Sequence, residues 1–139
     1  MQIPGRSTAG AFLVKEGRLL LERRPDDAEV YPGLWDTPGG HVENGETPET
    51  AMIREMDEEL AILPVRFILG MVQDDHDPVS NIFYRHFVYV VKEWEGESVS
   101  REGRHIRWFR FDDIFGLEPL NPLVRFALRS FMDWGWLED

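Results

Sequence analysis

The stretch GGHVENGETPETAMIREMDEELAI, which spans Gly39 to Ile62, decides the fold of this chain. A glycine pair opens it, and a sequence typical of a short helix closes it. Thr47 is a favoured N-cap residue, and Pro48 suits the first helical position, where no backbone N–H is needed. These signals predict a helix from about Pro48 to Leu60.

The predicted helix carries a cluster of carboxylates. Residues three and four positions apart share a helix face, so Glu55 lies beside both Glu58 and Glu59. Like charges this close disfavour one another and need a counter-charge, and hard divalent cations such as Mg2+ or Mn2+ bind oxygen ligands of this type. We expect the side away from the carboxylates to be buried. Its residues are Met52, Ile53, Met56 and Leu60.

Other residues of the stretch fit a metal site. Arg54 precedes Glu58 by four positions and can pair with it. Gly39 and Gly40 allow a tight turn and let a backbone carbonyl approach a metal. A glutamate-rich helix alone is more often a solvated face.

Gly40, Glu46 and the run from Arg54 to Ile62 resemble the Nudix box, Gx5Ex7REUxEExGU, in which U is a bulky aliphatic residue. Every fixed position matches except Ala61, where the family has glycine. If that position needs a positive φ, alanine costs about 1 kcal/mol, and we expect a slightly altered helix exit with intact metal chemistry. The resemblance extends from about Ala9 to about Val124 and is closest to the MutT-type nucleoside-triphosphate pyrophosphohydrolases.

The resemblance implies an α/β fold, the Nudix-type α/β/α sandwich with a mixed β-sheet, in one domain over residues 1–139. It places Glu55, Glu58, Glu59 and the Gly39 carbonyl around one or more divalent ions. Trp94-Glu95-Gly96-Glu97 and the following Glu102 match a segment in which a glutamate completes the metal environment from across the cleft. The catalytic set is Glu55, Glu58, Glu59, Arg54 and Glu46, with Glu46 in a supporting role; the general base stays open.

The resemblance also indicates residues for the substrate. Arg24 matches a phosphate-contacting arginine, and Arg23 points to the opposite face if the strand is regular. Asn121 matches a base-reading asparagine, although a helix cap ahead of Pro122 is an alternative role. Trp35 precedes the glycine turn and is a candidate for lining a base pocket.

The expected activity is a Mg2+- or Mn2+-dependent attack of water on the pyrophosphate linkage of a nucleoside triphosphate or related nucleoside diphosphate derivative. A triphosphate would give a nucleoside monophosphate and pyrophosphate. The alternatives are a Nudix hydrolase of nucleoside diphosphate sugars, dinucleoside polyphosphates or capped RNA, and a non-catalytic nucleotide sensor. Thr37 replaces the aromatic residue that the family usually has before the Pro-Gly-Gly turn, and no arginine begins the strand at Ile82. The sequence therefore does not identify the nucleobase of the substrate.

Composition bounds these expectations. The 139 residues are 42% hydrophobic and 12% aromatic, which fits one packed domain. Cysteine is absent, so disulfides and thiolate chemistry are excluded. The net charge of -11 disfavours polymeric nucleic acid as a partner. No apolar run reaches the ~18 residues of a membrane span, and the N-terminus lacks a signal-peptide core. We expect a cytoplasmic enzyme that acts on a small nucleotide substrate and could form a homodimer.

The remaining segments predict strands and one further long helix. Residues 9–15 and 18–23 read as a hairpin, and 65–73, 82–93 and 105–111 read as strands. Residues 74–78 are polar and predict a loop. Asp112 and Asp113 precede a short helical turn. A last helix is expected from Pro122 to about Trp134, with a buried side formed by Leu123, Phe126, Ala127 and Phe131.

Overall fold

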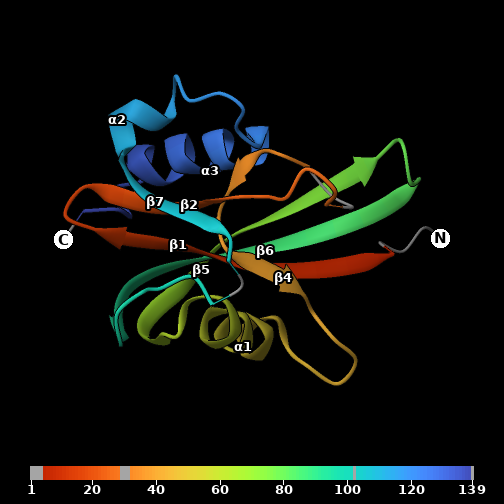
Figure 1. Cartoon of the computed structure of the whole chain (residues 1–139), viewed down its shortest axis with the longest axis horizontal. Helices are drawn as coiled ribbons and strands as arrows, with labels where there is room; N and C mark the ends of the chain where they lie inside the picture. Colours follow the sequence, from red (N-terminus) through yellow and green to blue (C-terminus); the bar gives the residue numbers. More distant parts are fainter. Residues whose placement is uncertain (1–4, 29–31, 102, 139) are drawn as a thin grey trace.

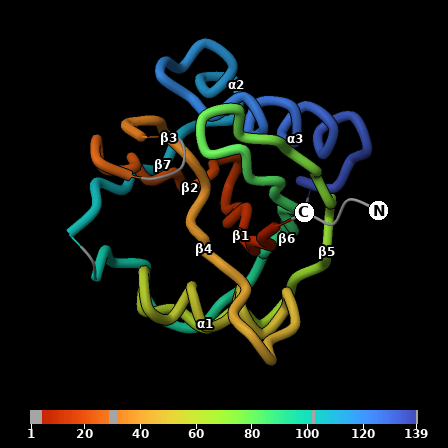
Figure 2. The backbone as a smooth tube through the Cα atoms, turned by 90° about the vertical axis from the view of Figure 1, so that its right-hand side faces the viewer, coloured from red at the N-terminus to blue at the C-terminus, as the bar shows by residue number. Residues whose placement is uncertain are grey.

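The computed structural model describes residues 5–28, 32–101 and 103–138. A mixed sheet lies between α1 (Pro48–Leu60) on one face and α2 (Phe111–Ile114) and α3 (Pro122–Asp133) on the other (Figures 1 and 2). The strands are β1 (Arg6–Lys15), β2 (Arg18–Arg23), β3 (Trp35–Asp36), β4 (Gly39–His41), β5 (Leu63–Asp77), β6 (Ile82–Glu95) and β7 (His105–Arg110). The predicted α/β/α sandwich is confirmed.

Strand β1 is the centre of the sheet. It pairs in parallel with β6, from Arg6 opposite Tyr84 to Leu13 opposite Val91, and antiparallel with β2 and β4. Strand β5 extends the sheet beyond β6, and β3 and β7 both pair with β2. The predicted hairpin between β1 and β2 turns at Glu16-Gly17, where both residues have positive φ. This geometry matches the twist of the two strands.

The polar segment after residue 73 continues as strand, so the loop predicted at 74–78 is largely wrong. Asp74 lies opposite Arg85 on β6, and two hydrogen bonds of 2.8 and 3.1 Å join the guanidinium to the carboxylate. Opposite charges at facing positions stabilise a strand pair. The chain turns later, over residues 78–81, where Asn81 has φ 58°.

The core has one layer on each face of the sheet. On the α1 face, Met52 and Met56 pack with Leu20 of β2. On the α3 face, Phe131 packs against Phe12 with ring centroids 5.1 Å apart. The buried side of α3 consists of Val124, Ala127, Leu128 and Phe131, whereas Phe126 is 61% exposed. The prediction for Phe126 was wrong because the stripe facing the sheet includes Val124 and Leu128 instead.

Candidate active site

Helix α1 has the predicted bounds, and a capping box between Thr47 and Thr50 closes its N-terminus. The Thr47 hydroxyl accepts a hydrogen bond from the Thr50 N–H, and the Thr50 hydroxyl accepts one from the Thr47 N–H, at 3.1 and 3.0 Å. The helix ends at Ala61, with φ 60° and ψ 36°. Ala61 itself takes the left-handed conformation that glycine takes without a steric penalty. The altered helix exit that we expected is therefore not seen.

Arg54 holds three carboxylates together on the side of α1 that faces β4. Its Nε and Nη2 donate to the two oxygens of Glu46 at 2.7 and 3.0 Å. Its Nη1 donates to Glu55 at 2.9 Å and to Glu58 at 3.1 Å. A further bond of 3.0 Å reaches the His41 carbonyl. The hydrogen bonds from Arg54 lower the pKa of Glu46 to about 2, so Glu46 is charged at neutral pH.

The two glycines of β4 are required by close approaches. A Cβ atom on Gly40 would lie 2.5 Å from Oε1 of Glu55, so the Glu55 carboxylate rests directly on the Gly40 backbone. A Cβ atom on Gly39 would collide with the Ala9 carbonyl oxygen of β1. The glycine pair thus lets α1 and β1 approach the same short strand from two sides.

Glu59 does not share the surroundings of Glu55 and Glu58. It is 2% exposed and accepts a hydrogen bond of 2.8 Å from Nη1 of Arg104. The same nitrogen donates to Glu22 of β2 at 2.7 Å, and Glu22 is 1% exposed. Burial, together with the nearby Glu22 and Glu55 carboxylates, raises the pKa of Glu59 to about 10. Burial likewise raises the pKa of Glu22.

Neither Glu22 nor Arg104 was predicted from the sequence. A signal for Glu22 did exist, because it lies two positions after Leu20, which packs under α1. Alternate strand residues face the same side, so Glu22 is a charge in an inward-facing position. Arg104 gives no such signal, because it lies in an irregular segment ahead of β7.

Backbone hydrogen bonds attach the segment before β7 to the end of α1. The Val99 N–H donates to the Leu60 carbonyl at 3.1 Å, and the Arg101 N–H donates to the Glu59 carbonyl at 2.8 Å. These carbonyls belong to the last turn of α1, where no partner exists within the helix. The segment that leads to Arg104 is therefore placed by main-chain contacts with the helix that carries Glu59.

A cavity of about 390 Å³ brings the two faces of the site together. On the α1 side it is lined by Glu55 and Glu58, together with the β4 glycines. On the α3 side its wall is apolar and includes Phe12, Val88, Leu123, Val124 and Ala127. Arg24, Asp36, Asn121 and Arg104 also line it. The cavity therefore combines acidic groups, two arginines and an apolar wall.

Asn121 and Asp36 form a polar pair in the wall of this cavity. Asn121 is buried and caps α3, because its Oδ1 accepts a bond of 3.0 Å from the Leu123 N–H. Its Nδ2 donates to Asp36 at 3.3 Å. Burial raises the pKa of Asp36, and the nearby Arg24 opposes this shift. Asn121 thus has the capping role and lines the cavity as well.

The NUDIX domain family matches residues 4–134 of this chain. This span includes the sheet, the Arg54 carboxylates and the cavity. The chain belongs to the Nudix family.

Individual relatives agree with this assignment. The 8-oxo-dGTP diphosphatase of Escherichia coli is 35% identical over 99 residues, which cover 71% of this chain and 74% of that protein. The ADP-ribose pyrophosphatase of Methanocaldococcus jannaschii is 30% identical over 125 residues, which cover 88% and 70%. The crystal structure of the MutT NUDIX hydrolase from Burkholderia pseudomallei matches with a TM-score of 0.81 at 35% identity, covering 89% of this chain and 95% of that one. The predicted class, a MutT-type Nudix hydrolase, is confirmed.

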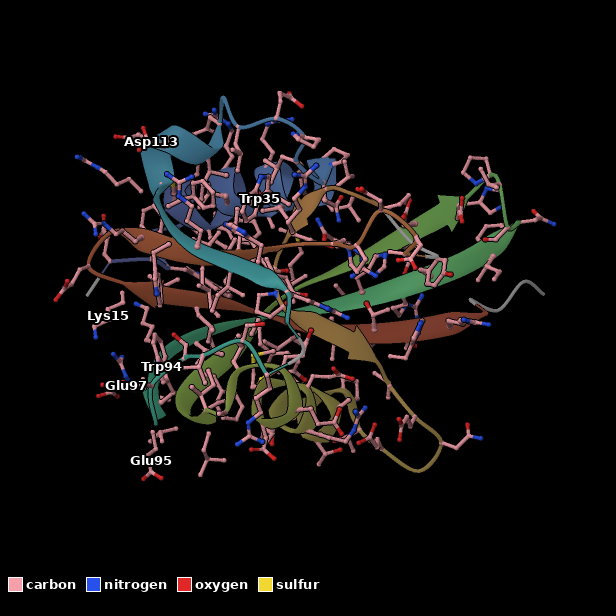
Figure 3. The ribbon with its side chains drawn as sticks, in the orientation of Figure 1. Lys15, Trp35, Trp94, Glu95, Glu97 and Asp113 are labelled. Atoms are coloured by element: carbon pink, nitrogen blue, oxygen red, sulfur yellow. The ribbon has the colours of Figure 1, made fainter. Side chains whose placement is uncertain are left out.

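The substrate residues predicted for this Nudix hydrolase have different positions. Arg24 lines the cavity, whereas Arg23 is exposed and donates from Nε to the Gly33 carbonyl at 3.2 Å. Trp35 is not among the residues that line this cavity. Its ring lies on the α3 side of the sheet (Figure 3) and packs edge-to-face with Phe109 at 5.1 Å.

The structure describes most, but not all, of the residues predicted to bind a metal. Glu102 lies outside the described residues, and Glu95 and Glu97 before it are exposed (Figure 3). Within residues 5–28, 32–101 and 103–138, no three His, Cys, Asp or Glu side chains are close enough together to hold a metal ion. The donors are nonetheless suitable for a hard cation. Carboxylates from α1 line the cavity, and Oε2 of buried Glu59 has no hydrogen-bond partner among the described residues.

Nudix hydrolases generally depend on a divalent metal and act on small nucleotide substrates. In the part of the chain that the structure describes, no helix has the length and apolar character that a membrane crossing requires.

Proposed function

We propose that this chain is a Mg2+- or Mn2+-dependent pyrophosphohydrolase that converts a nucleoside triphosphate into a nucleoside monophosphate and pyrophosphate. The observation that carries the proposal is a cavity in which the α1 carboxylates face an apolar wall with the Asp36–Asn121 pair. A cation–phosphate group and a planar base are accommodated by these two sides. The cytoplasm is the proposed location.

The cation would be held by Glu55, Glu58 and Glu59, with the Gly39 carbonyl and Glu102. When bound, it supplies charge neutralisation at the diphosphate and activation of water. Arg54 keeps Glu55 and Glu58 oriented towards the cavity through bonds of 2.9 and 3.1 Å. Glu46 receives two bonds from Arg54 and so acts on the carboxylates through that side chain.

A charged group would orient the phosphates of the substrate, and an apolar surface would orient its base. Arg24 lines the cavity, and its guanidinium can hold phosphate oxygens through two parallel hydrogen bonds. Leu123 and Val124 offer an apolar surface to the base. The Asp36 carboxylate and the Asn121 amide lie beside that surface and can hydrogen-bond to a base edge. Trp35 and Arg23 are left out of the proposed substrate contacts.

Hydrolysis of a nucleotide panel tests the proposal. The panel contains 8-oxo-dGTP, the common ribo- and deoxyribonucleoside triphosphates, ADP-ribose and a nucleoside diphosphate sugar, each with Mg2+, with Mn2+ and with a chelator. The expected result is metal-dependent release of a monophosphate and pyrophosphate, identified by chromatography. If no compound is hydrolysed with either metal while nucleotides bind, the chain is a non-catalytic sensor and the proposal is refuted.

A second candidate substrate class is a nucleoside diphosphate linked to a sugar. The relative from Methanocaldococcus jannaschii, which is 30% identical over most of this chain, favours it because that protein is an ADP-ribose pyrophosphatase. The same panel separates the two classes, since ADP-ribose would yield AMP and a sugar phosphate without free pyrophosphate. A homodimer is also proposed, and sedimentation equilibrium of the purified chain tests it.

A further inference from the structure

Arg104 separates two buried carboxylates from the cavity. Arg104 lines the cavity, whereas Glu22 and Glu59 do not. A single nitrogen of Arg104, Nη1, lies 2.7 Å from Glu22 and 2.8 Å from Glu59. Both glutamate side chains are 2% exposed, and that of Arg104 is 24% exposed. The guanidinium therefore lies between the cavity and the acidic pair.

The contacts of this pair are those of a cation site. Two carboxylates share one guanidinium nitrogen, so both oxygens lie where one small cation could touch them. Oε2 of Glu59 is buried and has no hydrogen-bond partner among the described residues. A buried polar oxygen that makes no hydrogen bond costs free energy, and coordination of a ligand removes that cost. The unpartnered oxygen therefore points to a ligand.

We propose that Glu22 is a further acidic member of the metal site, and that Arg104 is a tethered counter-cation which a divalent ion displaces from Glu22 and Glu59. This inference rests on the metal dependence in the proposed function. Arg104 and the ion compete because both need the same two oxygens. Glu22 comes from β2 and stands outside the Nudix box, so the site would draw acids from the sheet as well as from α1.

The backbone next to Arg104 is open. The preceding residue, Gly103, has φ 70°, and a Cβ atom there would meet nothing within 4 Å, so the backbone at this point is open. The Arg104 side chain already borders the cavity. After displacement its guanidinium would face the space proposed for the diphosphate, and a guanidinium binds phosphate oxygens well. Metal entry would thus place an additional positive charge beside the substrate.

The test is an isothermal calorimetric titration of Mn2+ into the protein in the absence of nucleotide. Arg104→Gln removes the competitor, and we expect Mn2+ to bind about tenfold more tightly, which is within the usual range of coupling between two sites. Glu22→Gln removes a ligand and should weaken binding about tenfold. The double variant should lose the gain made by Arg104→Gln. Arg104→Lys keeps a cation and should bind Mn2+ close to wild type.

Arg101→Gln is the matched control. Arg101 lies in the same segment, but its side chain is 52% exposed and 3.7 Å from Asp57. It should leave Mn2+ affinity unchanged. Thermal unfolding adds a second measurement, because a ligand that binds more tightly to the folded state raises the melting temperature more. The rise on adding Mn2+ should therefore be larger for Arg104→Gln than for wild type, even if this variant is less stable without metal.

Three results would overturn the inference: equal or weaker Mn2+ binding by Arg104→Gln, wild-type binding by Glu22→Gln, or no Mn2+ binding by the wild type. The first two can occur in an enzyme that hydrolyses nucleotides, and they leave the proposed function intact. A wild type that binds Mn2+ but hydrolyses no nucleotide refutes the proposed function while the metal titrations still decide the roles of Glu22 and Arg104.

Discussion

Two arginines gather carboxylates beside one cavity, and their surroundings differ. Arg54 holds Glu46, Glu55 and Glu58, whose side chains are 19%, 14% and 52% exposed. Arg104 holds two glutamates whose side chains are both 2% exposed. Ion pairs that water can reach contribute little free energy, so the Arg54 group chiefly orients its acids. In the buried group, desolvation makes the charge state itself depend on what binds.

The largest effect is expected from Glu59→Gln, which removes one of the two carboxyl groups that Arg104 holds. Turnover should fall about a hundredfold or more, since a proposed metal ligand is lost. The fold should survive, because an amide is easier to bury than an unpaired carboxylate. The metal-dependent kcat measures the loss of turnover, and the melting temperature shows whether the fold survives. Glu49→Gln, in the exposed first turn of the same helix, is the control, and wild-type turnover by Glu59→Gln would remove Glu59 from the site.

Arg54→Met tests the open group, which consists of Arg54 with the water-accessible Glu46, Glu55 and Glu58. Without the guanidinium, Glu55 and Glu58 lose the bonds that orient them, and turnover should fall about 10- to 100-fold, as is usual for residues that position metal ligands. The free energy of unfolding should fall by only about 1 kcal/mol. Arg54→Lys keeps the charge but lacks the planar fork, so it should restore part of the stability and little of the turnover. Full activity of Arg54→Lys would show that charge alone suffices.

Gly40→Ala disturbs the open group from the side of β4. The new methyl would lie 2.5 Å from the Glu55 carboxylate and force this side chain to move. We expect about a tenfold loss of turnover with little change in melting temperature, because misplacing a reacting group by about an ångström is costly. Gly116→Ala is the control, since a Cβ atom there meets nothing within 4 Å. Equal turnover of both variants would contradict the close approach.

The pH dependence of stability reports on the open group. The pKa of Glu46 is lowered from 4.5 to about 2 in the folded protein by its hydrogen bonds with Arg54. The stability that Glu46 contributes is therefore fully present above pH 4.5 and is lost as the pH falls towards 2. Urea unfolding should show wild type losing more stability than Glu46→Gln over this range. Glu43→Gln is the control, and parallel pH curves for wild type and Glu46→Gln would contradict the assignment.

Ala61→Gly should have the smallest effect. Ala61 has φ 60°, where alanine costs about 1 kcal/mol relative to glycine, while glycine in turn loses more freedom on folding. The net gain in unfolding free energy should be about 0.5 kcal/mol, measured by urea denaturation. Turnover should not change, since both arginine groups already have their contacts. A lower stability of Ala61→Gly would show that the left-handed conformation carries no strain here.

The sequence predicted α1 well because this helix depends on local signals, whereas the sandwich was implied by the resemblance to the Nudix family. Thr47 and Pro48 begin the helix where predicted, and Arg54 pairs with Glu58 as their spacing indicates. The face of Glu59 was harder to predict, although it lies seven positions after Met52 and thus on the buried stripe. Helical spacing shows which residues are neighbours, but not how far a neighbouring strand covers them.

The parts that were missed depend on contacts between distant segments. Glu22 and Arg104 are 82 positions apart, and the pairing of β2 with β7 brings them together. Trp35 was assigned to the cavity because it precedes the glycine turn, but its ring packs on Phe109 of β7. The strand at Asp74 required its partner Arg85. Such long-range pairings leave no local pattern in one sequence.

The main-chain attachment of Val99 and Arg101 to the last turn of α1 has a consequence for how this enzyme could diversify. Their N–H groups hold the segment in place whatever side chains it carries. Substitutions in this segment can therefore replace one charged group with another without altering the distance to the helix. Selection or laboratory evolution could change the metal preference or the catalytic pH range through these side chains, while the framework of the domain stays the same.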